Sequence, residues 1–258
     1  MFQLSANLEL IFNEAGADYI ERARAAAAAG FDAVEIWGTT NKDVQALAAA
    51  LRDLGLTLTS MVVEPRANLV FPDTDYAPFF DGLARSLEHA QQLGCHRMVI
   101  SPGLGFPGMN RQRNLEKLIG VYSKVLERVG TADVTILHEP VNTRVDHPGV
   151  LVDRTADALS VIRAVGSPKL RLLYDFYHSV VEGEDPATTL PGAVDVLDYV
   201  QFADAPGRAE PGSGAIDWPG CFQLLKSVGY RGPIGLEYRP QTSSAASVKR
   251  IMEWARAS

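Results

Sequence analysis

The feature of this chain that most constrains its fold is a regular alternation of short apolar segments with longer amphipathic or alanine-rich segments. Short apolar runs rich in β-branched and aromatic residues predict strands, and the longer segments predict helices. The predicted strands cover residues 2–7, 33–37, 56–64, 97–103, 134–140, 170–175, 198–204 and 233–238. The helices are predicted near residues 18–29, 42–54, 76–93, 112–129, 154–165, 186–190, 218–228 and 245–257. Repeated strand–helix units are typical of α/β proteins with a parallel sheet.

Two further features decide between the parallel α/β folds. Five glycines follow predicted helices, at positions where a left-handed cap is commonly needed: Gly30, Gly55, Gly94, Gly166 and Gly229. No glycine-rich phosphate-binding loop follows the first predicted strand, which argues against a doubly wound open sheet. The length of 258 residues matches the roughly 250 residues of one barrel. We therefore predict a single TIM barrel domain, (β/α)₈, spanning residues 1–258.

Composition and charge exclude several classes of protein. The formal net charge of -7 argues against a nucleic-acid ligand, because nothing would attract a phosphate backbone. Cys95 and Cys221 lie far apart, which predicts neither a disulfide framework nor a zinc site and favours a reducing, cytoplasmic setting. The first residues lack the features of a secretory signal, and no segment has the roughly 20 apolar residues of a membrane span.

Polar side chains stand at or near the C-terminal ends of the last four predicted strands. These residues are Glu139, Asp175, Gln201 and Glu237. Each occurs once per strand–helix unit, and the active site of a β/α barrel lies at the C-terminal ends of its strands. We therefore expect the four side chains to converge at one mouth of the barrel. The alternative for any one of these acids is a solvated strand-end residue.

Three carboxylates placed together repel one another and force abnormal protonation unless a cation lies between them. Three carboxylates and an amide form a set of hard oxygen ligands, which favours Mg²⁺ or Mn²⁺. The sequence therefore predicts one divalent metal ion, Mg²⁺ or Mn²⁺, bound by Glu139, Asp175, Gln201 and Glu237.

The chain resembles the sugar isomerase and epimerase barrels of the xylose isomerase-like superfamily, and within it hydroxypyruvate isomerase and the 2-oxo-tetronate isomerases. The segments that carry the resemblance are SANLELIF, GFDAVEIW, HEPVN, YDFYH, QFADAPGRAEPGSGAIDW and LEYRPQT. Gln201 points toward hydroxypyruvate isomerase, because the related ketose 3-epimerases usually have histidine at that position. The chain departs from the family in the segment VVEPRANLVFPDTD and in Arg239, which stands where lysine is frequent.

The resemblance implies a metal-dependent aldose–ketose isomerase that converts hydroxypyruvate to tartronate semialdehyde through an enediolate. Glu139 and Glu237 would act as the acid/base pair while also contacting the metal ion. His178, three residues after Asp175, is a candidate for binding a substrate oxygen. Arg208, in a glycine-rich loop, is a candidate partner for a substrate carboxylate. The alternative for His178 is a packing or capping role, and for Arg208 a solvated one.

Three other functions remain open from the sequence. A ketose or keto-acid epimerase, or a 2-oxo-tetronate isomerase, would use the same two glutamates. A phosphodiesterase of the endonuclease IV type shares the Asp-x-x-His spacing but needs several zinc ions and many histidines, whereas this chain has five. A non-catalytic sugar-acid binder is the third. Apart from the phosphodiesterase, each of these functions implies a small keto acid or sugar as the ligand. None of them implies a nucleic-acid or membrane partner, and each is compatible with a homo-oligomer.

Overall fold

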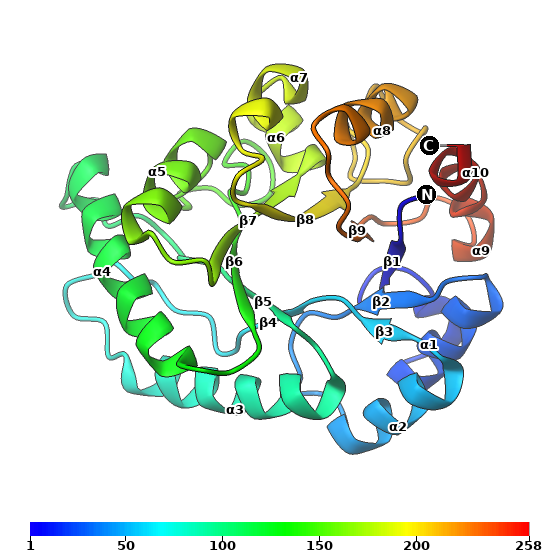
Figure 1. Ribbon diagram of the computed structural model, residues 1–258, viewed down its shortest axis with the longest axis horizontal. Helices are drawn as coiled ribbons and strands as arrows, with labels where there is room; N and C mark the ends of the chain where they lie inside the picture. The colour runs from blue at the N-terminus through cyan, green and yellow to red at the C-terminus, as the bar shows by residue number, and fades with distance from the viewer. Residues whose placement is uncertain (258) are drawn as a thin grey trace.

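The computed structural model describes residues 1–257, in which parallel strands form a closed ring surrounded by helices (Figure 1). The strands are β1 (Leu4–Asn7), β2 (Ala33–Glu35), β3 (Thr57–Leu58), β4 (Met61–Val62), β5 (Arg97–Ile100), β6 (Thr135–His138), β7 (Leu170–Asp175), β8 (Leu197–Phe202) and β9 (Ile234–Leu236). Their order in the sheet is β3-β2-β1-β9-β8-β7-β6-β5-β4. All of these pairings are parallel.

The ring closes because β3 and β4 are consecutive parts of one strand. β3 pairs with β2, and β4 pairs with β5 on the other side. Between them the ladder to β2 continues, since Thr59 N donates to Val34 O and Ile36 N donates to Ser60 O. The nine strand segments therefore occupy eight positions around the barrel, and the predicted (β/α)₈ fold is confirmed.

The helices form the outer layer of the barrel (Figure 1). Their bounds are η1 (Asn13–Ala15), α1 (Tyr19–Ala28), α2 (Val44–Leu54), α3 (Ala77–Leu93), α4 (Arg111–Val129), α5 (Thr155–Val165), α6 (Phe176–Glu182), α7 (Pro186–Thr189), η2 (Leu190–Gly192), α8 (Trp218–Ser227), α9 (Ser244–Ser247) and α10 (Lys249–Ala257). The five glycines predicted to cap helices all have positive φ. None of the helices within residues 1–257 is both long enough and apolar enough to cross a bilayer.

Helix α6 is a difference from the sequence prediction, which placed no helix between residues 175 and 186. It is seven residues long and mostly buried, so it lacks the alternation of apolar and polar faces that reveals a surface helix. Its N-terminus is capped by Asp175, whose carboxylate accepts from Tyr177 N and His178 N. The predicted C-terminal helix is also divided, into α9 and α10.

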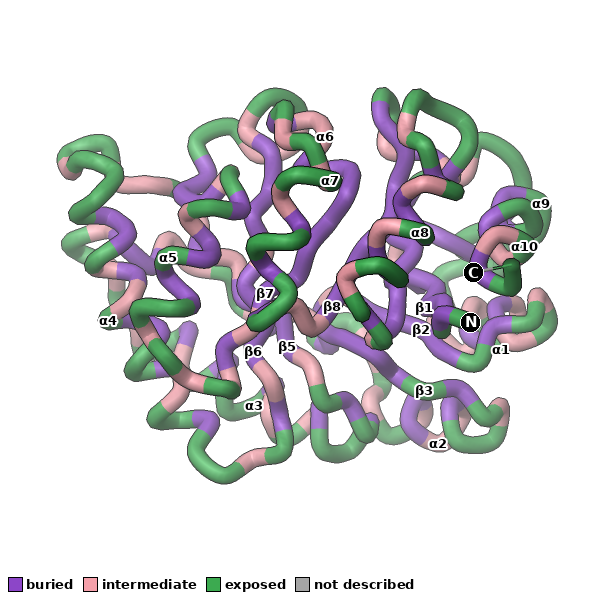
Figure 2. The backbone as a smooth tube through the Cα atoms, turned by 45° about the horizontal axis from the view of Figure 1, so that its top comes forward, coloured by how far each residue is buried: buried purple, intermediate pink, exposed green. Residues whose placement is uncertain are grey.

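The strands separate two apolar layers by the alternation of their side chains. Val99, Leu137, Leu173 and Tyr199 point inward and form a small cluster inside the ring. Their neighbours one position earlier or later, such as Met98 and Ile136, belong to the larger core between strands and helices. Figure 2 shows the strands buried and the outer helical faces exposed. Inward-pointing positions two residues further along the same strands therefore form the next layer, at the C-terminal mouth.

Candidate active site

The inward alternation of β6, β7 and β8 determines which polar side chains enter the barrel. Glu139, Asp175 and Gln201 each stand two residues after an inward apolar residue, namely Leu137, Leu173 and Tyr199. They therefore point into the ring at its C-terminal mouth, as the sequence predicts. The register supports this placement, because Asp175 lies directly beside Gln201 in the pairing of β7 with β8.

Three buried oxygens in this layer have no hydrogen-bond partner among residues 1–257. They are Glu139 Oε1, Asp175 Oδ2 and Gln201 Oε1. Buried polar atoms in folded proteins are almost always satisfied, so three unpartnered oxygens in one layer are a set of acceptors that a cation could satisfy. The donor set of two carboxylates and an amide fits a hard divalent cation.

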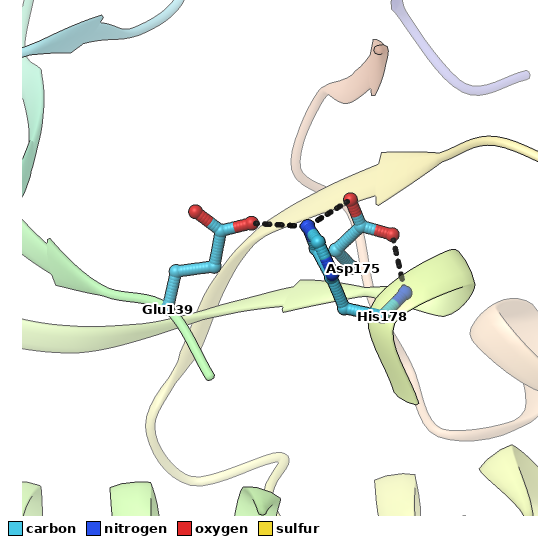
Figure 3. A group of neighbouring side chains, drawn as sticks. All are labelled: Glu139, Asp175 and His178. Carbon is cyan, nitrogen blue, oxygen red and sulfur yellow. Dashed lines mark hydrogen bonds and ion pairs between the residues drawn. The ribbon is translucent and has the colours of Figure 1, made fainter. Parts of the chain in front are cut away.

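His178 lies between the two carboxylates (Figure 3). Its Nε2 is 3.9 Å from Glu139 Oε1 and 4.0 Å from Asp175 Oδ2. One ligand atom from each of the three residues lies within 4.8 Å of the others, a spacing that can hold a metal ion. His178 is thus at the site, as predicted.

The hydrogen bonds of Asn142 fix the tautomer of His178. The Asn142 backbone N–H donates to His178 Nδ1 at 3.1 Å, and the Asn142 side-chain amide donates to the same atom at 2.7 Å. The orientation of that amide is set because its oxygen accepts from Val145 N and Asp146 N. Since Nδ1 is an acceptor, a neutral ring carries its proton on Nε2. His178 therefore presents an N–H donor to the cavity and not a metal ligand, whereas Asp175 and Glu139 present oxygens.

Glu237 has a different environment from the other two carboxylates. Its Oε1 accepts from Trp37 Nε1 at 2.6 Å, and its Oε2 accepts from Arg208 at 3.0 Å. Arg208 also lies 4.0 Å from Asp175 Oδ2 and 3.7 Å from Asp146 Oδ1. The guanidinium of Arg208 is thus committed to the acids of the site, with a backbone φ of 52 held in the left-handed region.

Glu35 lies beneath the site and orients Gln201. Gln201 Nε2 donates to Glu35 Oε1 at 3.0 Å, so the amide oxygen of Gln201 faces the cavity. Glu35 also accepts from Asn7, Ser60 and Tyr199. Burial raises the pKa of Glu35 to about 7, with a further contribution from the charge of Glu237. Glu35 stands near the end of the predicted strand 33–37, whereas no sequence signal indicated Tyr199.

Burial also raises the pKa values of the inward carboxylates. The pKa of Glu139 is raised well above its ordinary value, first by burial and then by the charges of Glu237 and Asp175. The pKa of Asp175 is raised to about 7, mainly by burial. A bound cation would reverse these shifts, because an adjacent positive charge stabilises the ionised form. Burial lowers the pKa of His178 well below its ordinary value, so the ring is neutral near pH 7.

A cavity of about 240 Å³ opens above these groups. Its walls include Trp37, Val141 and His147, together with the guanidinium-bearing residues Arg66 and Arg239. The size is below that of sites for drug-sized ligands, so a small metabolite fits best. Trp37 ends a predicted strand, but the rule that identified Glu139 selects polar side chains and does not cover it, and no sequence signal indicated His147.

The remaining histidines are placed elsewhere. His138 is buried and its Nδ1 bonds to the hydroxyl of Tyr122 on α4, so it faces the helices. His89 bonds to Thr39, and His96 is exposed. Glu64 accepts from Thr39 N and is likewise structural.

The loop of residues 206–214 is held by Asp204, whose carboxylate accepts from Gly212 N, Ile216 N and the indole N–H of Trp218. These bonds fix both ends of the loop and bring Arg208 to the site. The loop therefore supports Arg208 at the site.

The fold and the site together define a β/α barrel whose acidic mouth could hold a metal ion and opens into a small polar cavity. Residues 23–258 match the family model described as xylose isomerase-like TIM barrel, and the chain belongs to this family. It is 32% identical over 256 residues to 2-oxo-tetronate isomerase of Cupriavidus necator, covering 96% of both chains. It is 30% identical over 257 residues to hydroxypyruvate isomerase of Escherichia coli, covering 96% of this chain and 98% of the relative.

A solved structure has a closely similar fold. The crystal structure of AP endonuclease, family 2 from Brucella melitensis superimposes with a TM-score of 0.89 and 27% sequence identity, covering 98% of this chain and 99% of the other. The resemblance inferred from the sequence motifs is therefore confirmed at the level of the family.

Proposed function

We propose that this protein is an aldose–ketose isomerase that interconverts hydroxypyruvate and tartronate semialdehyde. The observation that carries the proposal is the layer of unpartnered oxygens on Glu139, Asp175 and Gln201 at the mouth of an isomerase-family barrel. Relatives named hydroxypyruvate isomerase and 2-oxo-tetronate isomerase support the same class of reaction. The 240 Å³ cavity supports a substrate of a few carbons.

We further propose that Glu139, Asp175 and Gln201 hold one divalent metal ion, Mg²⁺ or Mn²⁺, with Glu237 as the fourth ligand. When bound, such an ion supplies Lewis-acid stabilisation of the negative charge that develops on the substrate oxygens. The amide of Gln201 keeps the site one charge less acidic than a fourth carboxylate would, which favours an anionic substrate.

The proposed reaction moves protons between two carbons. One glutamate removes a proton from the carbinol carbon of hydroxypyruvate, which leaves an enediolate, and a proton is then delivered to the former carbonyl carbon. Glu139 and Glu237 are the proposed pair, since β6 and β9 bring them to the cavity from strands separated by β7 and β8. His178 Nε2–H is positioned to donate to a substrate oxygen, and Trp37 and Arg208 hold Glu237.

A 2-oxo-tetronate isomerase or a keto-acid epimerase would use the same residues. The similarity to the Cupriavidus necator relative supports the first of these. The alternatives differ in the substrate chosen and, for an epimerase, in returning the proton to the carbon from which it came. Substrate profiling with hydroxypyruvate, 2-oxo-tetronates and neutral ketoses separates them.

A phosphodiesterase is the second class of function to test, because the solved structure with the TM-score of 0.89 is described as an AP endonuclease. Chemistry that uses several zinc ions needs many histidine ligands. Of the five histidines, His147 and His178 line the cavity, and the others lie elsewhere in residues 1–257. The net charge of -7 also disfavours a nucleic-acid substrate. A cytoplasmic, small-molecule enzyme is therefore our proposal.

The test is proton NMR of hydroxypyruvate in D₂O with the protein and Mn²⁺ or Mg²⁺. We expect interconversion with tartronate semialdehyde and exchange of a carbon-bound proton, and a loss of roughly 10²- to 10⁴-fold in kcat for Glu139→Gln and for Glu237→Gln. Glu127→Gln on the exposed face of α4 is the matched control. If either active-site variant keeps nearly full activity, the proposed roles of Glu139 and Glu237 are wrong. If the wild-type protein binds hydroxypyruvate without converting it, the protein is a sugar-acid binder and not an isomerase.

A further inference from the structure

Arg208 is already paired with acidic side chains of the protein. Its Nη2 already donates to Glu237 at 3.0 Å, and Asp175 and Asp146 lie within 4.0 Å of the same guanidinium. Its side chain is 12% exposed, so it is packed among the acids of the protein. The charge of Arg208 is thus largely neutralised by the site itself, and an anionic substrate needs another cation.

Two other arginines line the cavity and have no such partner. The guanidinium groups of Arg66 and Arg239 make no hydrogen bond, ion pair or ring contact within the described part of the chain. Both residues are exposed at the opening, whereas the acids form the floor. An unpaired arginine beside a small polar cavity is free to bind a carboxylate in a fork.

The backbone around Arg66 is firmly placed although its side chain is free. Val63 N donates to Val99 O before it, and Leu69 N donates to Pro102 O after it. Gly82 of α3 lies so close to this loop that a Cβ added there would be 2.0 Å from Glu64 O. The loop therefore packs directly against α3. The backbone of Arg66 is therefore held in place on the cavity wall, in the loop between β4 and α3.

Arg66 lines the same cavity as Glu139 and His147. Burial raises the pKa of Glu139, and the charges of Arg208 and Arg66 oppose this rise. The imidazole of His147 packs beside that of His178, with ring centroids 5.5 Å apart, and has no hydrogen-bond partner in residues 1–257. Burial lowers the pKa of His147, and the charges of Arg208 and Arg66 lower it further, so a neutral ring stands ready to donate one N–H.

Arg239 approaches from another strand end. Its backbone N–H donates to Arg208 O at 2.9 Å, which ties the segment after β9 to the Arg208 loop. β9 and β4 are separated in the ring by β1, β2 and β3, so Arg66 and Arg239 stand on different parts of the rim. Together they make the opening cationic above an acidic floor.

We propose that Arg66 is a specificity-determining residue that binds the carboxylate of the substrate, with Arg239 as a second cation that attracts it into the cavity. The site then selects keto acids over neutral ketoses of the same length. This inference rests on the proposed isomerase function.

The test compares wild type with Arg66→Gln, Arg239→Gln and the double variant on hydroxypyruvate. Loss of a charge-assisted hydrogen bond predicts a KM about 10-fold higher for Arg66→Gln with little change in kcat, a smaller rise for Arg239→Gln and the largest rise for the double variant. The neutral competitor dihydroxyacetone has the same carbon number but no carboxylate, and its inhibition constant is expected to stay within about 2-fold. Arg85→Gln, an exposed arginine on α3, is the control and is expected to behave as wild type.

A second readout does not depend on turnover. Tartronate, a stable hydroxy dicarboxylate, is titrated into each protein by calorimetry, and its affinity is expected to fall about 10-fold in Arg66→Gln but not in Arg85→Gln. Equal tartronate affinity in wild type and the double variant would overturn the carboxylate assignment even if hydroxypyruvate is isomerised. Weakened tartronate binding without turnover of any keto acid would instead retain the subsite and overturn the proposed reaction.

Discussion

Gln201 donates a 3.0 Å hydrogen bond through Nε2 to Glu35 Oε1, and this bond turns the unpartnered oxygen of Gln201 toward the cavity. An amide can present either its oxygen or its NH₂ group to the cavity, so a neighbouring hydrogen-bond partner has to fix which of the two faces it. Glu35 does so, because its Oε1 accepts from Gln201 Nε2 and also from Asn7 Nδ2. The ligand character of Gln201 therefore depends on a residue from the far side of the ring, on β2.

The first prediction concerns this bond. Glu35→Gln replaces the carboxyl group with an amide that can also donate, which lets the Gln201 amide turn, so affinity for Mn²⁺ is expected to fall about 10- to 100-fold. Calorimetric titration with Mn²⁺ measures the effect, and Glu127→Gln is the control. Unchanged Mn²⁺ affinity in a folded Glu35→Gln protein would mean that Gln201 is not oriented in this way.

The second prediction concerns the indole that holds Glu237. Trp37→Phe keeps the aromatic ring but removes the N–H that donates to Glu237 Oε1 at 2.6 Å. A hydrogen bond to a charged group is worth about 1.5–3 kcal/mol, so kcat/KM is expected to fall about 10-fold or more. Steady-state kinetics on hydroxypyruvate checks this, with thermal unfolding as the test of the fold. Kinetics equal to wild type would show that Glu237 needs no such support.

Much of the architecture was predictable because each strand–helix unit carries its own local signal. The eight strand positions, the capping glycines and the convergence of Glu139, Asp175 and Gln201 all follow from short-range patterns and the direction of the strands. Helix α6 was not predictable, since seven mostly buried residues leave no amphipathic pattern. The partners of Glu35 were also beyond sequence reasoning, because Tyr199 is 164 positions away and meets Glu35 only through ring closure.

The roles of the individual arginines were also not predictable from the sequence. Arg208, in the glycine-rich loop after β8, was a candidate partner for a substrate carboxylate because guanidinium binds that group in a fork. In the structure it donates to Glu237, and a backbone bond from Arg239 N to Arg208 O ties its loop to the segment after β9. A sequence can place a guanidinium at the barrel mouth, but it cannot say which acid is nearest. Whether Arg208 also contacts substrate stays a prediction.

The third prediction concerns stability at acid pH. Burial lowers the pKa of His138 to about 3, whereas an unfolded histidine titrates near 6.5. Above about pH 6.5 both states are unprotonated; below it the unfolded state takes up a proton that the folded state does not, so folding is destabilised as pH falls. The contribution approaches about 1.4 kcal/mol per pH unit from this one group. Urea unfolding between pH 7.5 and 4.5 is expected to show a steeper loss for wild type than for His138→Gln. Parallel pH profiles would contradict the assignment.

The fourth prediction concerns the thiols. Burial raises the pKa of Cys95 to about 12 and that of Cys221 to about 12, so at pH 8 only about one thiol in 10⁴ is ionised. The native protein is expected to react negligibly with Ellman's reagent, and the protein in guanidinium is expected to release two equivalents. Fast reaction of either thiol in the native state would show that it is accessible.

The central claim is that the acidic layer binds one divalent ion, and metal stoichiometry tests it most directly. Chelator-treated protein is titrated with Mn²⁺ by calorimetry, and the loaded protein is analysed for metal content. We expect one ion per chain, and a loss of affinity greater than about 100-fold in the folded Glu139→Gln, Asp175→Asn double variant. No bound ion, three ions per chain, or undiminished binding by the double variant would contradict the account.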